Sequence, residues 1–178
     1  NANLKTSMAD YQIVKNENDD LKNLLGRIEQ KNSFTLATIL AKPNQSPYDT
    51  IIIDIGADFS LKEGEKVYAD GGIPIGEVSK VYARNPLVML YSNPGQITEG
   101  VLNAQVELIG RGGGNFEMTI PRDIPSENGS LVVFPNLKSE IVAVIDGVIS
   151  IPTDPVKRVL LHSPVNIQNL KWVQVKKD

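Results

Sequence analysis

Two periodicities of apolar residues divide the chain close to residue 33. Before that point, apolar residues recur at alternating intervals of three and four, which is the period of a helix in a left-handed coiled coil. After it, short β-branched runs are separated by Gly, Pro, Asn and Asp, and no helical period of useful length appears. The pattern therefore predicts a coiled-coil helix over residues 1–32 followed by an all-β region.

The helical segment carries the seam of a coiled coil. With Leu4 at heptad position a, six of the eight seam positions are apolar. Position g holds Asp10 and Glu17, and the e positions five residues later hold lysine, so both pairs attract in a parallel dimer. An asparagine at an interior a position, Asn18, can pair with its twin in a parallel, in-register dimer. The predicted dimer interface consists of Leu4, Tyr11, Val14, Asn18, Leu21, Leu25 and Ile28.

A single amphipathic helix packed on the following domain is the alternative for this segment. The side of the helix away from the seam argues against it, because that side is almost wholly polar. A polar face of this kind is typical of a projecting rod. We therefore expect a parallel homodimer.

Turn residues divide the rest of the chain into twelve expected strands. They span residues 34–41, 49–55, 65–69, 75–82, 87–91, 102–109, 115–120, 130–134, 140–144, 148–151, 157–162 and 171–175. Strands at a spacing of roughly 8–12 residues, with turn signals between them, are typical of a β-barrel or a β-sandwich.

A weak internal repeat indicates how these strands are grouped. The segment Gly64–Val67 and the run Ile75–Val78 resemble Gly129–Val132 and the run Ile141–Val144. The offset between the copies starts at 65 residues and grows to about 70. If the repeat is real, the β region contains two similar small barrels; the alternative is that unrelated β-barrels share such spacing.

The fold class expected from these patterns is all-β, with two small six-stranded barrels preceded by the coiled-coil helix. The first barrel is expected over residues 33–95 and the second over 96–155. The final segment, about 156–178, is a candidate to complete the first barrel, although the pattern leaves open which barrel its last strand closes.

Composition removes several classes of function. The chain is 41% hydrophobic and 22% charged, as in an ordinary globular protein, and its net charge of −3 gives no reason to expect a nucleic-acid partner. Cysteine is absent, which removes disulfides, thiolate catalysis and most structural zinc sites. No run of 18 apolar residues is present. Because the chain starts without Met inside a helical pattern, we expect a preceding segment that could carry a signal or a membrane anchor.

The run Ile51–Ser60, IIIDIGADFS, raises the question of an aspartic protease, because Asp54 follows an apolar strand and precedes a glycine. Such enzymes need two carboxylates that share one proton. They also carry Ser or Thr directly after the aspartate, whereas Ile55 stands there, and no second Asp-[Ser/Thr]-Gly follows. We therefore interpret Asp54 as the end of a strand and Gly56 as part of a turn.

The other candidate sites are weaker. His162 is the only histidine, and its neighbour Ser163 points to the opposite face of a strand, so a Ser-His pair is not expected. The run Gly110–Gly114 precedes a strand and not a helix, so we predict a flexible loop where a partner could dock, and no phosphate site. The carboxylates lack calcium-loop spacing. We expect no catalytic residue, no metal and no cofactor.

Two apolar features lie at expected turns, where apolar side chains are unusual. They are Ile73 with Ile75, and Phe134 with Leu137. Each pair either folds back onto its own barrel or belongs to a partner-docking surface.

Taken together, these segments resemble the MreC family of rod shape-determining proteins. The alanine-rich strand Leu36–Ala41 and the run Tyr48–Gly56, which ends Ile-Asp-Ile-Gly, are similar to the family's first strands. Leu61–Val67 resembles its Gly-x-x-Val step, Gly76–Val81 its Gly-Lys-Val strand, and Asn169–Val175 its closing strand. Gly72–Gly76 carries one residue more than the family pattern, and residues 96–155 match weakly.

The resemblance implies a non-enzymatic, single-pass membrane protein whose present residues face the periplasm or the outer cell surface. It implies a homodimer that can assemble into filaments and that scaffolds the peptidoglycan elongation machinery. The implied partners are the class B penicillin-binding transpeptidase, the membrane protein MreD and the actin-like MreB.

Two other functions remain open from the residues alone. One is a hydrolase on a two-barrel fold that uses His162 or Asp54. The other is a periplasmic adaptor of a secretion or efflux assembly, which also joins a coiled coil to β-barrels.

Overall fold

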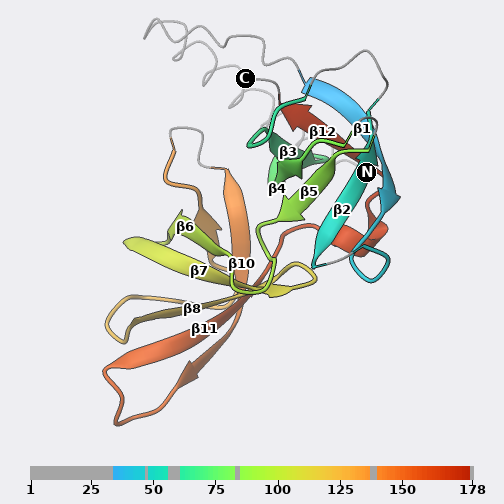
Figure 1. Ribbon diagram of the computed structural model, residues 1–178. Helices are drawn as coiled ribbons and strands as arrows, with labels where there is room; N and C mark the ends of the chain where they lie inside the picture. The colour runs from blue at the N-terminus through green and yellow to red at the C-terminus, as the bar shows by residue number, and fades with distance from the viewer. Residues whose placement is uncertain (1–33, 47, 56–60, 83–84, 137–139, 177–178) are drawn as a thin grey trace, which may run out of the picture. The chain divides into compact units, whose positions relative to one another are not determined.

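The computed structural model describes residues 34–46, 48–55, 61–82, 85–136 and 140–176. Within these ranges the chain is all-β, as predicted, with one 3-10 helix, and no helix in them is long and apolar enough to cross a bilayer (Figure 1). The elements are β1 (Phe34–Ala41), β2 (Thr50–Asp54), β3 (Lys66–Ala69), β4 (Ile73–Lys80), β5 (Leu87–Leu90), β6 (Ile97–Val101), β7 (Gln105–Gly112), β8 (Asn115–Pro121), β9 (Leu131–Val133), β10 (Ile141–Ser150), β11 (Val156–His162), η1 (Ile167–Asn169) and β12 (Trp172–Lys176).

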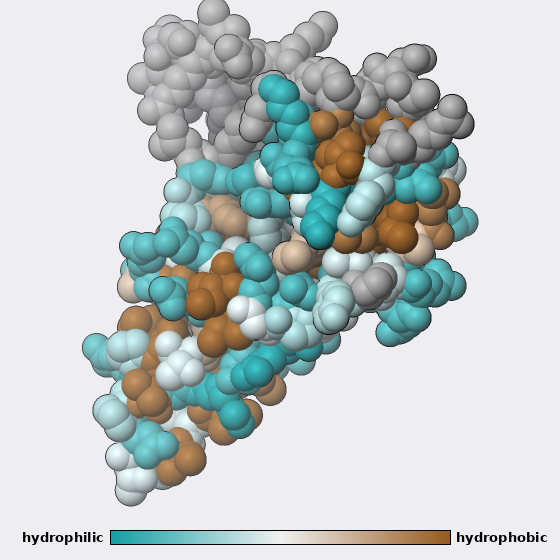
Figure 2. Space-filling model, in the orientation of Figure 1, coloured by the Kyte–Doolittle hydropathy of each residue, from teal (hydrophilic) through white to brown (hydrophobic). Residues whose placement is uncertain are grey.

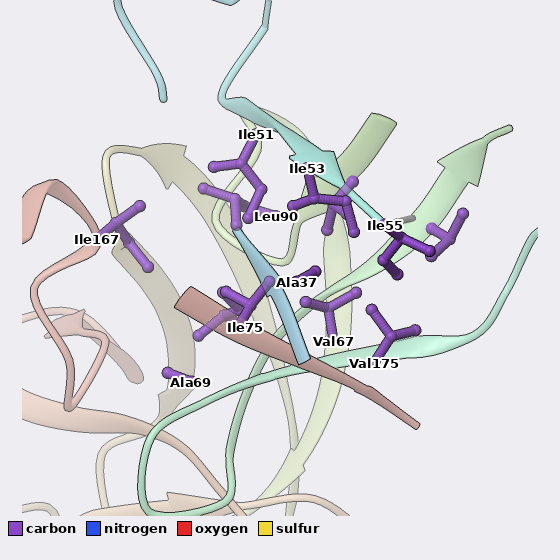
Figure 3. Close-up of a cluster of buried hydrophobic side chains, with 13 residues drawn as sticks. Ala37, Ile51, Ile53, Ile55, Val67, Ala69, Ile75, Leu90, Ile167 and Val175 are labelled. Carbon is purple, nitrogen blue, oxygen red and sulfur yellow. The ribbon is translucent and has the colours of Figure 1, made fainter. Parts of the chain in front are cut away.

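The first barrel is closed by six strands in the order β1-β12-β3-β4-β5-β2. Because successive residues of a strand point to opposite faces, alternate side chains such as Ile51, Ile53 and Val67 meet in one buried core (Figure 3). The last strand, β12, pairs with β1 on one side and β3 on the other. The C-terminal strand therefore closes the first barrel.

The second barrel is closed in the order β10-β11-β8-β7-β6-β9, around a core that includes Leu108, Met118 and Val159. β11 pairs with β8 along its whole length, from Val156 to His162. The expected boundary at residue 155 is therefore wrong. The second barrel extends to His162, and only the segment after it returns to the first barrel.

Two strand predictions in the second barrel are also wrong. β6 was not predicted because its inward-facing residues are Thr98 and Gly100, whereas Ile97 faces solvent with 57% of its surface exposed. β10 joins two predicted strands, because Asp146 forms a β-bulge where the sequence indicates a turn.

The two barrels share one topology. Replacing β1–β5 by β7–β11, and β12 by β6, converts the strand order of the first barrel into that of the second. Register shifts occur at corresponding pairs: β1–β2 and β7–β8, β3–β4 and β9–β10, β4–β5 and β10–β11. The predicted internal repeat is thus confirmed at the level of the strands, with one strand supplied from the other end of the chain. Its second run is shifted by one residue, because Val78 corresponds to Ile145 and not to Val144.

The local bonding at the repeat agrees with this correspondence. The amide of Gly64 donates to the carbonyl of Val78, whose own amide donates to the carbonyl of Glu65. Gly129 and Ser130 exchange the same two bonds with Ile145. Both glycines have positive φ, at 91° and 86°, a conformation that other residues resist. The glycine that the repeat contains is therefore needed by the turn before β3 and β9.

Candidate functional site

The two residues considered for catalysis lie on the surface of different barrels. Asp54 ends β2 and is exposed, opposite Thr38 of β1. His162 ends β11, with 47% of its side chain exposed, and its Nδ1 atom lies 4.0 Å from Oδ1 of Asp146. Across the described ranges, no group of three or more His, Cys, Asp or Glu residues is placed to hold a metal ion. Asp54 is a strand end, as interpreted from the sequence.

Ser163, the neighbour of His162, has a structural contact. Its amide donates to the carbonyl of Gly114 at 2.7 Å, and its Oγ accepts a hydrogen bond from the amide of Val165 at 3.4 Å. Ser163 therefore fixes the start of the segment that leads from β11 back to the first barrel.

The four residues considered for partner docking differ in their surroundings. Ile75 is 4% exposed and belongs to the core of the first barrel, so the docking interpretation is wrong for it. The register shift opposite Val67 and Tyr68 is what turns this side chain inwards. Ile73 is half-buried at the start of β4. Leu137 lies outside the described residues, as do the seven seam residues of the predicted coiled coil, Leu4 to Ile28.

Phe134, the fourth of these residues, contacts the first barrel. Its ring centroid lies 5.2 Å from that of Tyr91 at an interplanar angle of 63°, and the ammonium group of Lys66 lies 5.0 Å above it. Beside it, the Tyr68 hydroxyl donates to Oε1 of Glu140 at 3.1 Å. We call this set, Lys66, Tyr68, Tyr91, Phe134 and Glu140, the aromatic contact. It joins the end of the β9–β10 ladder to β3 and to the residue after β5.

The tyrosines of the aromatic contact are buried hydrogen-bond donors. Tyr68 is 2% exposed and Tyr91 is 7% exposed. Burial raises the pKa of the Tyr91 hydroxyl far above its ordinary value, and the nearby carboxylate of Glu77 adds to the shift. The Tyr91 hydroxyl donates to Oε1 of Glu77 at 3.0 Å.

The glycine run forms the second contact between the barrels. The carboxylate of Asp49 accepts from Ser92 Oγ at 2.6 Å and from the Gly113 amide at 2.8 Å. Ser92 Oγ in turn accepts from the amide of Gly114 at 3.0 Å, and the Ser92 carbonyl accepts from the amide of Gly112. We call Asp49, Ser92 and Gly112–Gly114 the clamp. The expectation of a flexible loop open to a partner is wrong, because the loop is bonded to the first barrel.

The clamp requires an unusual backbone, which explains its composition. Gly112, Gly113 and Gly114 all have positive φ, between 62° and 93°. Asp49 has φ 45°, in the left-handed region that Asp and Asn tolerate better than most residues. A run of glycines before a strand is thus a signal of a close backbone contact as much as of a loop.

Asp49→Asn should lower the free energy of unfolding by about 1–2 kcal/mol. Each carboxylate oxygen of Asp49 accepts one charge-assisted hydrogen bond, and the change replaces one of these oxygens by an NH₂ group, which only donates. Asparagine keeps the shape and tolerates the same backbone, so the change tests the bonding alone. Urea denaturation measures the difference, and Asp54→Asn is the matched control at an exposed aspartate. Equal stability of the two variants would contradict the role of the clamp.

A polar hollow of about 370 Å³ lies at the loop after β1, a few residues before Asp49 of the clamp in the sequence. Its lining residues are Lys42, Pro43, Asn44, Gln45 and Gln168. The Lys42 ammonium donates to the backbone carbonyl of Gln168 at 2.5 Å, and the side-chain Nε2 of Gln168 donates to the carbonyl of Pro43. These bonds fasten the loop after β1 to η1, so we assign the hollow a structural role.

Exposed apolar residues form two patches that the sequence analysis missed. One lies on the outer face of the first barrel, where Leu36 and Leu40 of β1 flank the residue that pairs with Trp172 of β12, and Phe34 continues the same face; each is 45–65% exposed. Figure 2 shows that apolar areas interrupted by polar surface occur over both barrels. Both faces of β1 are apolar, so alternation alone does not indicate which face is outside.

The second patch lies at the hairpin between β10 and β11. It consists of Ile149, Ile151 and Val156, each 42–55% exposed; Val148 pairs with the buried Val159 and faces the other side of the strand. The guanidinium of Arg122 bonds the carbonyls of Ile151 and Pro152, which fixes the turn of this hairpin to the segment after β8. Fixed apolar side chains on a surface are typical of protein–protein contacts.

Comparison with known proteins agrees with this architecture. A family model described as rod shape-determining protein MreC, barrel core, matches residues 39–177. No curated protein matches the sequence. The crystal structure of MreC from Pseudomonas aeruginosa is similar with a TM-score of 0.68 at 16% identity, over 82% of this chain and 100% of that one.

Two further solved structures are similar. MreC of Listeria monocytogenes has a TM-score of 0.69 at 20% identity, over 99% of this chain and 90% of that one. The major periplasmic domain from the cell shape-determining filament MreC, in its orthorhombic form, has a TM-score of 0.58 at 15% identity, over 83% of this chain and 97% of that one. At these identities the likeness establishes a shared fold.

Proposed function

This chain belongs to the MreC family of rod shape-determining proteins, and we propose that it is a non-enzymatic scaffold of the bacterial cell-wall elongation machinery. The observation that carries the proposal is the extent of the family match, which runs through both barrels from residue 39 to residue 177. A scaffold acts by holding partners at fixed positions, and it needs rigid modules with exposed contact surfaces. The barrels and their two apolar patches supply both.

The proposed partners follow from the family. They are the class B penicillin-binding transpeptidase, MreD and MreB, with peptidoglycan synthesis as the process they serve. We propose that the patch on β1 and β12 and the patch on the β10–β11 hairpin are the docking surfaces for partners on the outer side of the membrane. Of the docking residues proposed from sequence, Phe134 is withdrawn, because its ring packs within the aromatic contact.

Dimerisation and location are part of the same proposal. The seam of residues 1–32 would pair two chains, and the pairs could associate further into filaments. A membrane helix upstream of Asn1 would anchor the protein, with the barrels in the periplasm or at the outer cell surface. The supporting observations are the heptad pattern and the opposite charges at positions g and e.

Complementation of rod shape tests the proposal. In cells of the source bacterium depleted of this protein, the full-length wild type should restore the ratio of cell length to width. Val14→Asp together with Leu21→Asp should fail to restore it, because two charges in the seam separate the helices. The matched control is Asn16→Asp together with Asn23→Asp, which adds the same charges to the polar side of the helix.

Two further variants separate a scaffold from an enzyme. Asp54→Asn and His162→Ala should complement as well as the wild type, since neither side chain is proposed to react. Round cells with either variant, at normal protein levels, would favour the hydrolase. Normal rods with the seam double variant would contradict the dimeric scaffold.

A further inference from the structure

The clamp and the aromatic contact differ in what holds them together. Both lie within the compact unit Phe34–Asp178 and both connect the first barrel to the second. In the clamp, the backbone of the second barrel is bonded directly to Asp49 and Ser92. In the aromatic contact, the described interactions with the first barrel are made by side chains.

The clamp also coincides with both chain crossings. The segment between β5 and β6 carries Ser92 into the clamp, and the segment between β11 and η1 starts at Ser163, which is bonded to Gly114. A covalent chain passes between the barrels at each crossing. Separating the barrels here would break backbone hydrogen bonds and strain two connections at once.

On the side of Phe134 and Glu140, the aromatic contact has no such covalent connection, although Tyr91 directly precedes Ser92 in the β5–β6 crossing. Phe134 follows β9 and Glu140 precedes β10, and the Phe134 amide donates to the Glu140 carbonyl at 2.8 Å. This bond extends the β9–β10 ladder within the second barrel and does not depend on the first. The two side chains can therefore leave Tyr68 and Lys66 while the ladder that carries them stays intact. The Tyr91 ring packs with Phe134 in the core of the second barrel and stays there.

We propose that the aromatic contact is a releasable latch and that the clamp is the pivot about which the two barrels open. The inference concerns the barrels alone and does not depend on which partners they bind. Opening removes the cover from the Tyr68 side chain, which is 2% exposed in the closed form. If the protein is a scaffold, the latch sets the distance between its two docking patches.

A spin-label pair measures the opening directly. The chain contains no cysteine, so Glu63→Cys and Asn128→Cys place one label on an exposed turn of each barrel, at corresponding positions of the repeat. Pulsed electron–electron distance measurement on the full chain, diluted with unlabelled protein to suppress distances between chains, should give one narrow distribution for the wild-type background. Tyr68→Phe together with Phe134→Ala should raise the open-to-closed ratio at least ten-fold and produce a second, longer distance.

Controls distinguish a latch from general loosening. Tyr82→Phe, at an exposed tyrosine, should leave the distribution unchanged. Tyr68→Phe alone keeps the ring and removes only the hydroxyl, so it should give a smaller shift in the same direction even if the double variant folds poorly. Hydrogen exchange at the Gly113 and Gly114 amides should stay slow in the latch variants and become faster in Asp49→Asn.

Either of two results would overturn the inference. One is an unchanged distance distribution in a folded Tyr68→Phe, Phe134→Ala variant. The other is loss of protection at Gly113 and Gly114 in that variant, which would mean that the barrels separate as a whole and do not pivot on the clamp.

Discussion

Replacing Gly110 with alanine should lower the free energy of unfolding by about 3 kcal/mol, one of the largest effects expected from a single methyl group in this chain. A Cβ atom at this position would lie 2.2 Å from the carbonyl oxygen of Asn93 and 2.6 Å from the carbonyl carbon of Ser92. Both neighbours are backbone atoms of the crossing between the barrels, so no side-chain rotation relieves the clash. Urea denaturation followed by circular dichroism measures the loss.

Gly147→Ala is the matched control for that experiment. Gly147 lies on β10 in the same barrel, and a Cβ atom there would meet no atom within 4 Å. Alanine at this site should change the unfolding free energy by less than about 0.5 kcal/mol, or raise it slightly by restricting the unfolded chain. If Gly110→Ala and Gly147→Ala are equally stable, the close approach at Asn93 does not constrain the fold.

Replacing Glu65 with methionine should raise the free energy of unfolding of the first barrel by about 2 kcal/mol. Glu65 is 2% exposed, and neither carboxylate oxygen has a hydrogen-bond partner among the residues that the structure describes. It lies two residues before Val67 and therefore shares the inward face of that strand with the core. Methionine has similar length and removes the cost of burying a polar group without a partner.

The single tryptophan allows the unfolding of the first barrel to be followed separately in the Glu65→Met variant. Trp172 lies on β12, so its fluorescence reports the unfolding of the first barrel. The variant should show a higher urea midpoint with an unchanged slope. Glu63→Met, at the exposed glutamate two residues earlier, should leave the midpoint unchanged. A lower midpoint for Glu65→Met would mean that the carboxylate makes a stabilising contact in the folded protein.

Strand prediction succeeded where residues alternate between a barrel core and solvent. β1 begins and ends at the predicted residues, and β5, β8, β11 and β12 agree within one residue at most positions. β6 was not predicted because a threonine and a glycine occupy its inward face. Its residues do alternate between the two faces, but the buried positions lack the large apolar side chains that mark a strand in a sequence. The pairing of β6 with β7 along five residues outweighs that weak local preference.

The candidate sites were predicted less well than the strands. The sequence indicated correctly that Asp54 ends a strand. It indicated a free loop at Gly110–Gly114, because a run of glycines looks the same whether it is open or held by a neighbour 64 residues away. Phe134 and Ile75 both occur next to proline at apparent turns, yet one ends in the contact between the barrels and the other in a core.

The sequence by itself determined the all-β class and the family and gave a weak indication of two similar barrels, because hydrophobic periodicity and local turn chemistry are properties of neighbouring residues. Only the tertiary structure decided that β12 closes the first barrel, that β11 belongs to the second, and that Asp49 bonds the glycine run. These features join residues far apart in the chain, and their free energy depends on a geometry that no local pattern records.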